Sequence, residues 1–424
     1  MSERKLRRRY VLLVVLHYFP VGVTMPVTVL MFDARGLSIG AIGAMYAVFT
    51  IAVGLLELPT GGLADTWGRR PVLLLAATAD VVGLVAFALA NSLVLLLLAV
   101  LVLALGQALY SGPLEAWYVD AVHAQDARAD VTPGLARGHS AQGLGLGIGA
   151  LVGGALPQLA GGLPSDGDDV LLSFSVPFLV AAGLSAIGMV AIATLLDEPP
   201  RERTHVAAPG VVATMRRAIS ISTRNTAVRA VLGRFTLVAC GTMAFELIVP
   251  VRLEALTDQP ERAASVYAAI FTAGMLGSAI SANLAPFVRR RFGGAASGAM
   301  VVTVAGGVVA CLGAIDGVVP VAIGLLGGYL LTGPARPLLA EVIHREVAAG
   351  ERATVLSAQS IVAMIGAFAG SLLLPALAGA STTGMAMLVG GLVIAAGGVP
   401  LATIARRPTD QEPISVAVPT SVDS

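Results

Sequence analysis

Charged residues are scarce in this chain of 424 residues, because Asp, Glu, Lys and Arg together make up only 12% of it. A soluble domain typically carries about 25%, so an ordinary water-soluble globular protein is excluded. Cysteine is also scarce: Cys240 and Cys311 are the only two, and both lie in apolar runs. This placement argues against a disulfide framework or a cysteine metal site.

Motifs of common enzyme classes are missing as well. The sequence has no nucleotide-binding loop, no paired-aspartate diphosphate motif and no histidine-rich metal cluster, and the acidic run "SDGDD" at 165–169 has no partner motif. The tail after Arg407 is short, so we expect no appended soluble domain. An integral-membrane enzyme and a signalling receptor are therefore both disfavoured. We expect no cofactor, no metal and no nucleic-acid partner.

Long apolar runs dominate what is present. Hydrophobic residues make up 56% of the chain, and the mean hydropathy is +0.85. Runs of about 20 apolar residues are long enough to cross a bilayer as helices. Twelve such spans are predicted, at 10–32, 38–60, 71–91, 93–118, 140–162, 170–196, 228–254, 264–287, 296–314, 318–342, 354–378 and 383–405. The fold class is therefore all-α integral membrane with twelve transmembrane helices.

The distribution of arginine between the connections predicts the orientation. Arginine-rich connections, such as "SERKLRRR", "DTWGRR" and "RRRFGG", alternate with arginine-poor ones, such as "NS", "IDG" and "GAST". Positive charge is enriched on the cytoplasmic side, which places both termini in the cytoplasm. Lys5 is the one lysine among 27 basic residues, and this composition is typical of a GC-rich bacterium. We therefore expect a multi-pass protein of the bacterial cytoplasmic membrane.

An internal repeat divides the spans into two sets of six. The stretch "ANLAPFVRRR" at 282–291 follows the eighth span much as "GGLADTWGRR" at 61–70 follows the second, although Asp65 is matched by Pro286 and Gly68 by Arg289. Two related bundles with a site between them are a common transporter plan. The predicted domains are a six-helix bundle at 1–196, a central cytoplasmic loop at 197–227, a pseudo-symmetric six-helix bundle at 228–407 and a disordered tail at 408–424.

The stretch "GGLADTWGRR" lies between the second and third spans and reads as a tight hairpin of about ten residues. Its glycines permit a turn and close helix contact, and its arginines suit the cytoplasmic interface. No topology signal requires Asp65, but a carboxylate there is well placed to meet the positive end of a helix. A solvated basic turn is the simpler interpretation. The order of Gly61, Asp65, Gly68, Arg69 and Arg70 nevertheless resembles the signature loop of the major facilitator superfamily.

This resemblance extends over essentially the whole chain and implies a conformational latch. In the family, the loop's Asp meets the start of the eleventh helix, and its Arg pairs with acids at the cytoplasmic end of the fourth. The matching positions here are "RATVLS" at 352–357, and Glu115 and Asp120 in "EAWYVD". The latch is expected to stabilise the outward-facing state.

A glycine stripe in the fifth span bears on the direction of transport. Gly145, Gly149, Gly153 and Gly154 are similar to the family's antiporter motif, although Ala150 stands where the motif has proline. Ordinary small-residue packing is the alternative. The resemblance favours export. The family's frequent arginine in the middle of the fourth span is missing, and Gln107 is the only strongly polar residue at that depth.

Ionisable residues within predicted spans are functional candidates by default, because each costs about 2.5–3.5 kcal/mol at the bilayer centre. The resemblance implies that spans one, four, seven and ten line the cavity while three, six, nine and twelve support it. Glu246 and His17 are thus favoured for substrate or proton binding over Asp80, which is as well explained as a neutral structural acid. Glu57 either carries protons or braces the latch. Other candidate cavity residues are Tyr18, Tyr46, Gln107, Tyr110, Gln142 and Tyr329, and residues expected nearer the interfaces are Arg234, Arg252, Glu254, Arg336 and Glu341.

The function predicted from the sequence is secondary active transport. The preferred hypothesis is proton-coupled export of a hydrophobic or amphipathic small molecule, such as a drug or natural product, by alternating access, with protons or sodium as the coupling ion. An apolar cavity with few acids suits such cargo better than sugars or phosphates. The alternative is an importer or uniporter of a small nutrient with the same fold. We expect a monomer in the lipid bilayer.

Overall fold

The computed structural model describes residues 3–198, 216, 220, 221, 223–335, 338 and 352–405. These residues form helices and connecting loops, with no strand among them. Most of the central loop, the end of the tenth predicted span and the predicted tail lie outside the described residues, as do Arg336 and Glu341.

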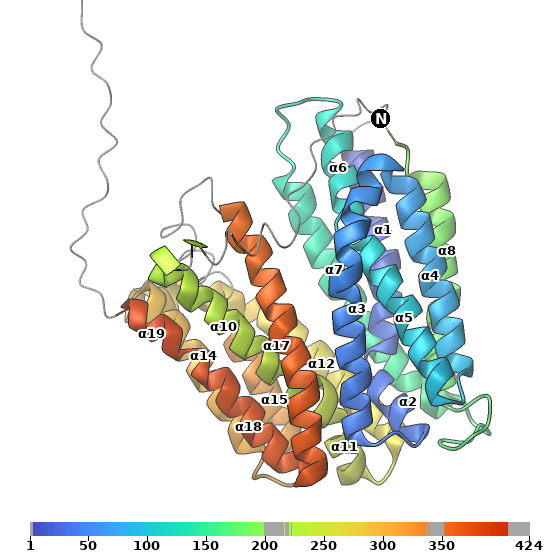
Figure 1. Cartoon of the computed structure of the whole chain (residues 1–424), viewed down its shortest axis with the longest axis vertical. Helices are drawn as coiled ribbons and strands as arrows, with labels where there is room; N and C mark the ends of the chain where they lie inside the picture. Colours follow the sequence, from blue (N-terminus) through green and yellow to red (C-terminus); the bar gives the residue numbers. More distant parts are fainter. Residues whose placement is uncertain are drawn as a thin grey trace, which may run out of the picture.

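The helices fall into two groups that follow each other along the chain (Figure 1). The N-terminal group comprises α1 (Glu3–Thr24), α2 (Thr28–Ala34), α3 (Ile39–Thr66), α4 (Arg69–Leu89), α5 (Leu93–Tyr110), α6 (Pro113–His123), α7 (Thr132–Leu159) and α8 (Ser175–Leu195). The C-terminal group comprises α10 (Thr226–Met243), the π-helix η1 (Ala244–Ile248), α11 (Val249–Thr257), α12 (Pro260–Ser281), the 3₁₀ turn η2 (Ala282–Leu284), α13 (Ala285–Phe292), α14 (Gly294–Leu312), α15 (Val318–Thr332), α17 (Arg352–Ala380), α18 (Thr383–Ala396) and α19 (Val399–Ala405).

The chain is a multi-pass membrane protein by the length and composition of its helices. Nine helical segments of the described part are long and apolar enough to cross a membrane, and two shorter apolar helices lie at Ala296–Leu312 and Val318–Thr332. The glycine-rich helix α7 is not among the nine, although its 28 residues are ample in length. Each of the twelve predicted spans therefore coincides with a helix, in whole or in part.

Several predicted spans are broken where proline or glycine interrupts the backbone pattern. Pro26 lies in the break between α1 and α2, since proline cannot donate a backbone hydrogen bond. Gly112 separates α5 from α6 with φ of 90°, a conformation that favours glycine. In the seventh span the backbone widens into η1 immediately before Pro250 in α11.

The loop at 61–70 differs from its prediction as a ten-residue hairpin. Helix α3 continues through Gly61 and Gly62 to Thr66, so only Trp67 and Gly68 separate it from α4. Gly68 alone makes the turn, with φ of 99°. Glycine inside a helix costs only about 1 kcal/mol, so the pair at 61 and 62 does not end the helix.

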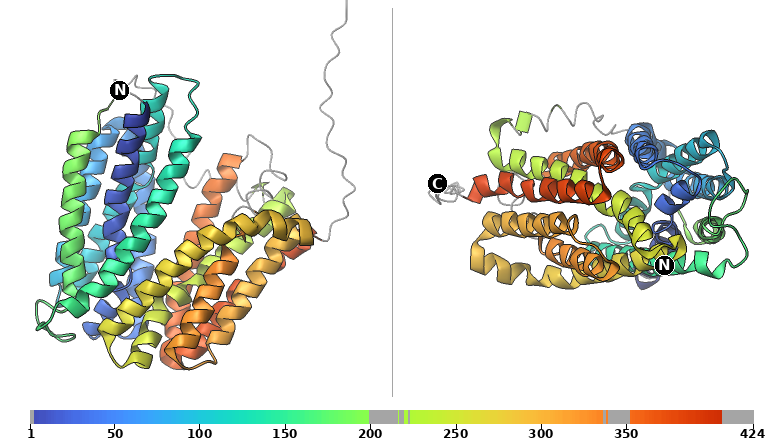
Figure 2. Two further views of the ribbon diagram at one scale, coloured as in Figure 1. Left: turned by 180° about the vertical axis from the view of Figure 1, so that it is seen from behind. Right: turned by 90° about the horizontal axis from the view of Figure 1, so that it is seen from below.

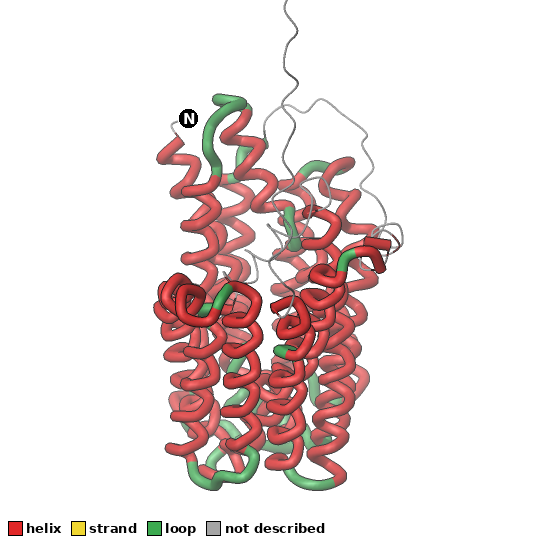
Figure 3. The backbone as a smooth tube through the Cα atoms, turned by 90° about the vertical axis from the view of Figure 1, so that its left-hand side faces the viewer, coloured by secondary structure: helices red, strands yellow, loops and turns green. Residues whose placement is uncertain are grey.

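The two groups contact each other at the end of the molecule opposite the N-terminus (Figure 1). We call this end the closed side. There the beginning of α3 packs on the end of α17, since a Cβ at Gly43 would lie 2.7 Å from the ring of Pro375. The end of α7 packs on the beginning of α12, where a Cβ at Gly154 would lie 2.8 Å from the Ala264 carbonyl. Figure 2 shows the groups diverging toward the end of the molecule that holds the N-terminus, and Figure 3 shows helices joined by loops in the described part of the chain.

Hydrogen bonds tie the groups together at the closed side. Ser165 and Ser173, in the connection after α7, donate to the Glu261 carboxylate of α12 at 2.5 and 3.1 Å. Gln158 donates to the backbone carbonyl of Glu261 and to the Ser265 hydroxyl at 3.3 and 2.9 Å. Because each of these hydrogen bonds joins the N-terminal group to the C-terminal group, separation of the groups at the closed side would break them.

Candidate functional site

A central cavity of about 280 Å³ lies between α1–α5 and α8 on one side and η1 and α12 on the other. Aromatic rings form much of its wall, including Phe32, Phe49, Phe87 and Phe178. No lysine or arginine is among the described residues that line it. The cavity therefore offers apolar surface and few charges to a ligand.

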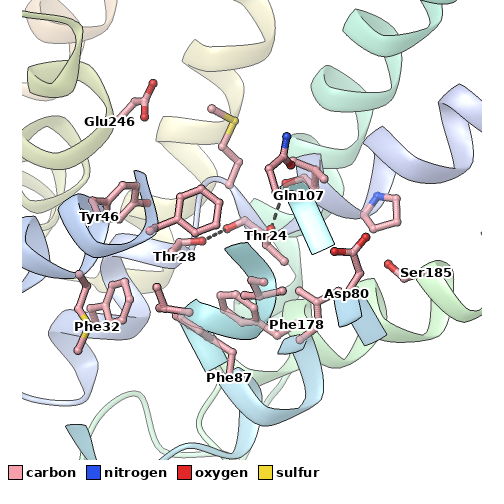
Figure 4. A pocket seen from close by; sticks show the side chains of 18 of the residues that line it. Thr24, Thr28, Phe32, Tyr46, Asp80, Phe87, Gln107, Phe178, Ser185 and Glu246 are labelled. Carbon is pink, nitrogen blue, oxygen red and sulfur yellow. Dashed lines mark hydrogen bonds between the residues drawn. The ribbon is translucent and has the colours of Figure 1, made fainter. Parts of the chain in front are cut away.

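The titratable side chains of this cavity sit on opposite walls. Asp80 of α4 and Ser185 of α8 lie on one wall, whereas Glu246 of η1 lies across the cavity from them (Figure 4). Gln107 of α5 also lines the cavity (Figure 4). Because Asp80 belongs to the N-terminal group and Glu246 to the C-terminal group, each group contributes one acid.

Asp80 and His17 are paired within the N-terminal group. A carboxylate oxygen of Asp80 lies 3.8 Å from Nδ1 of His17, and the two side chains expose only 18% and 9% of their surface. The His17 ring stacks on Tyr110 of α5, with centroids 3.2 Å apart and planes within 8°. Gly106 leaves the space for the carboxylate, because a Cβ at this position would collide with Oδ1 of Asp80.

Glu246 is positioned by the π-helix η1. π-Helical turns are rare and are frequently found at functional sites. The backbone carbonyl of the preceding residue, Phe245, accepts a hydrogen bond from the Tyr267 hydroxyl of α12 at 3.1 Å. Within the described part of the chain, no hydrogen bond or ion pair engages the Glu246 carboxylate. It is available to a ligand in the cavity.

The structure brings together His17, Asp80, Gln107 and Glu246, all of which line the cavity, together with Tyr46. Glu57 is not among the described lining residues, and neither are Tyr18, Tyr110, Gln142 and Tyr329. The expectation that the third and sixth spans only support the cavity is wrong here, because α4 and α8 contribute to its wall. Sequence reasoning missed Thr24, Thr28, Ser185 and Tyr267, which lack any charge or motif to mark them.

Among the described residues, Arg69 and Arg70 of the signature-like loop contact other parts of the N-terminal group. Arg69 pairs with Asp120 of α6 at 2.6 Å, and its backbone N–H donates to the carboxylate of Glu198. Arg70 donates to the backbone carbonyl of Ala193 near the end of α8. Glu115 forms no ion pair with a described residue. The side chain of Asp65 lies outside the described residues, so its contact with the start of α17 stays a prediction.

The glycine stripe of α7 is a close-packing surface. A Cβ at Gly145 would lie 3.3 Å from the backbone of Phe19, and one at Gly149 or Gly153 would collide with the α1 backbone. Gly154 faces the other way, onto α12. The stripe thus joins α7 to α1 within the N-terminal group, and its last glycine touches the C-terminal group.

The described residues contain no group of three His, Cys, Asp or Glu side chains placed to hold a metal ion. The central cavity is lined by a small number of ionisable groups and is enclosed by helices of both groups.

Comparison with known proteins adds a family and a fold. The family model described as Major Facilitator Superfamily matches residues 10–371. No curated protein gives a significant match. The crystal structure of the nucleoside transporter NupG superposes with a TM-score of 0.75 at 15% identity, covering 95% of this chain and 100% of that one.

Two further solved structures are similar. A bacterial homologue of the human lysosomal transporter Spinster, in an inward-facing and occupied conformation, has a TM-score of 0.71 at 14% identity and covers 94% of both chains. A POT family transporter in complex with 5-aminolevulinic acid has a TM-score of 0.69 at 12% identity, covering 94% of this chain and 96% of that one. At such identities the likeness shows the fold alone.

Proposed function

The chain belongs to the Major Facilitator Superfamily, and from this premise we propose that it is a proton-coupled exporter of hydrophobic or amphipathic small molecules. The observation that carries the proposal is the central cavity, whose wall is aromatic and aliphatic with one acid contributed by each helix group. Pockets for small molecules are typically mostly apolar with a few placed polar groups. Cargo with phosphate or carboxylate groups lacks a cationic partner among the described lining residues.

Alternating access follows from the proposed architecture of twelve spans in two six-helix bundles. Rocking of one bundle against the other exposes a fixed central site to each side of the membrane in turn. The closed-side contacts between α7 and α12 and between α3 and α17 hold one of the two arrangements. We assign the opposite side, which holds the N-terminus, to the cytoplasm of a bacterium, in agreement with the arginine distribution.

The loop containing Asp65, Arg69 and Arg70 is proposed as the inner latch of the outward-facing arrangement. The Arg69–Asp120 pair fixes the loop to α6. Because Asp120 is 46% exposed, we expect this pair to contribute no more than about 1 kcal/mol by itself. Its function is to orient the loop. A Asp65→Asn variant is expected to bind cargo but to change conformation more slowly.

The test is transport of a panel of lipophilic compounds into everted membrane vesicles, with and without the protein. An exporter accumulates substrate in such vesicles only when their interior is acid. Glu246→Gln is expected to lose coupled transport, since it removes the acid of the C-terminal group. Accumulation driven by the opposite gradient would indicate an importer instead, and equal movement without any gradient would indicate a uniporter. A panel in which no compound moves would refute the proposed substrate class.

A further inference from the structure

A second, smaller cavity lies inside the N-terminal group beside the His17–Asp80 pair. It has a volume of about 20 Å³ and is enclosed by α1, α4, α5 and α8. His17, Asp80 and Ser185 line both this side cavity and the central one. Leu13 and Ile192, which also line it, lie one to two turns from His17 and Ser185 toward the end of the group that holds the N-terminus. His17 and Asp80 thus lie between the central cavity and the side cavity.

The side cavity has the size and the polar groups that a bound water needs. About 10–15 Å³ is enough for one water, provided that the site offers polar partners. Nε2 of His17 and the hydroxyl of Tyr110 are both buried, and neither has a hydrogen-bond partner among the described residues. Buried polar groups are rarely left without a partner. A water in the side cavity supplies one.

The distance between His17 and Asp80 also indicates a bound water. At 3.8 Å, Nδ1 of His17 and the Asp80 carboxylate are too far apart for a direct hydrogen bond, yet close enough for each to respond to the charge of the other. No described lysine or arginine lines either cavity. Tyr18 and Tyr110 are the described titratable residues whose rings contact His17. The remaining titratable or charged groups on the four helices around the side cavity are Glu3, Arg4, Lys5, Arg7, Arg8, Arg9 and Tyr10 on α1, and Arg69 and Arg70 on α4.

We propose that His17 and Asp80 form one proton-binding site, hydrated through the side cavity, that exchanges the proton coupled to transport. The inference rests on the proposed function. In the protonated form the Asp80 carboxyl group holds the proton beside a neutral His17 imidazole, and the net charge of the pair is zero. Deprotonation passes that proton to the side-cavity water and on to the aqueous phase, and leaves a net charge of −1. An uncompensated charge is costly in an apolar wall, so the deprotonated form favours entry of a cationic or strongly polarised cargo group.

The first experiment needs no substrate. Infrared difference spectra of the purified protein are recorded across a pH series, and the band of a protonated carboxylic acid is followed. We expect Asp80→Asn to remove one such band and Glu246→Gln to leave that band in place. His17→Gln is expected to move its pH midpoint by one unit or more, because strongly interacting groups titrate as a pair. An Asp80 band that is unchanged in His17→Gln would overturn the shared site.

The second experiment measures transport by the same variants. Asp80→Asn and His17→Gln are expected to lose accumulation driven by a pH gradient, by tenfold or more, while labelled substrate still exchanges across the vesicle membrane at a reduced but measurable rate. Asp80→Asn vesicles that still accumulate substrate would overturn the coupling role. If the wild-type protein moves no compound, the proposed function fails while the infrared result still decides whether the pair exists. Size-exclusion profiles matched to wild type establish that each variant is folded.

Discussion

The hydrogen bonds to Glu261 give a quantitative prediction about the equilibrium between the two arrangements. Glu261 belongs to the C-terminal group, whereas its donors Ser165 and Ser173 belong to the N-terminal group. Opening the closed side must break both bonds. Glu261→Ala removes them while leaving the bond from Gln158 to the backbone carbonyl in place.

The magnitude follows from the number and the exposure of these bonds. A hydrogen bond to a charged group contributes about 1.5–3 kcal/mol when buried, and Glu261 is only partly buried. Taking about 1 kcal/mol for each bond gives about 2 kcal/mol, which corresponds to about a 30-fold change in the population ratio. A minor state at about one in a hundred would rise to about a quarter of the molecules.

The assay is the distance between spin labels at Leu159 and Val319, in a background with Cys240 and Cys311 replaced by serine. Leu159 and Val319 are both exposed and belong to different groups at the closed side. Glu261→Ala should add a longer distance to the distribution. Arg262→Ala is the matched control, because Arg262 is the next residue, is exposed and forms no hydrogen bond or ion pair with a described residue of the N-terminal group. Identical distributions in wild type and Glu261→Ala would refute the reasoning.

Two glycine substitutions test packing at the site. Gly106→Ala places a Cβ against the Asp80 carboxylate and should reduce gradient-driven transport by tenfold or more. Gly183→Ala is the control, because its Cβ meets nothing within 4 Å, and it should transport as wild type does. Equal activities of the two variants would show that Gly106 is not needed to make room for the Asp80 carboxylate. Gly153→Ala drives a Cβ into the α1 backbone and should destabilise the protein by about 1–3 kcal/mol, while Gly143→Ala, also in open space, should unfold thermally as wild type does.

The positions of the helices could be predicted because long apolar runs report directly on segments that can cross a membrane. Their ends were less predictable. The glycines in "GGLADTWGRR" suggested a turn, yet α3 runs to Thr66 and the turn is confined to Trp67 and Gly68. Glycine residues permit a turn but do not require one. Whether the chain turns there depends on tertiary packing, which cannot be read from the local sequence.

The site was predicted in part for a similar reason. Depth in the membrane follows from position in a span, so His17, Gln107, Asp80 and Glu246 could all be selected. Whether each side chain points into the cavity or away from it could not be predicted in the same way. Asp80 was ranked below Glu246 because the family resemblance placed the third span outside the cavity, whereas the space left by Gly106 lets the Asp80 carboxylate reach the wall.

The distribution of acids between the groups has a mechanical consequence. His17 and Asp80 lie in the same group, so rocking of the two groups leaves their separation unchanged. Glu246 lies in the other group, and every change of access must therefore alter its distance from Asp80. A site for a proton benefits from the first arrangement, since its affinity must persist while the protein moves. A cargo site benefits when its acids lie in different groups, as Asp80 and Glu246 do. A substrate that contacts both walls is then bound tightly in one conformation and weakly in the other. The proposed mechanism thus assigns different roles to two acids that look alike in the sequence.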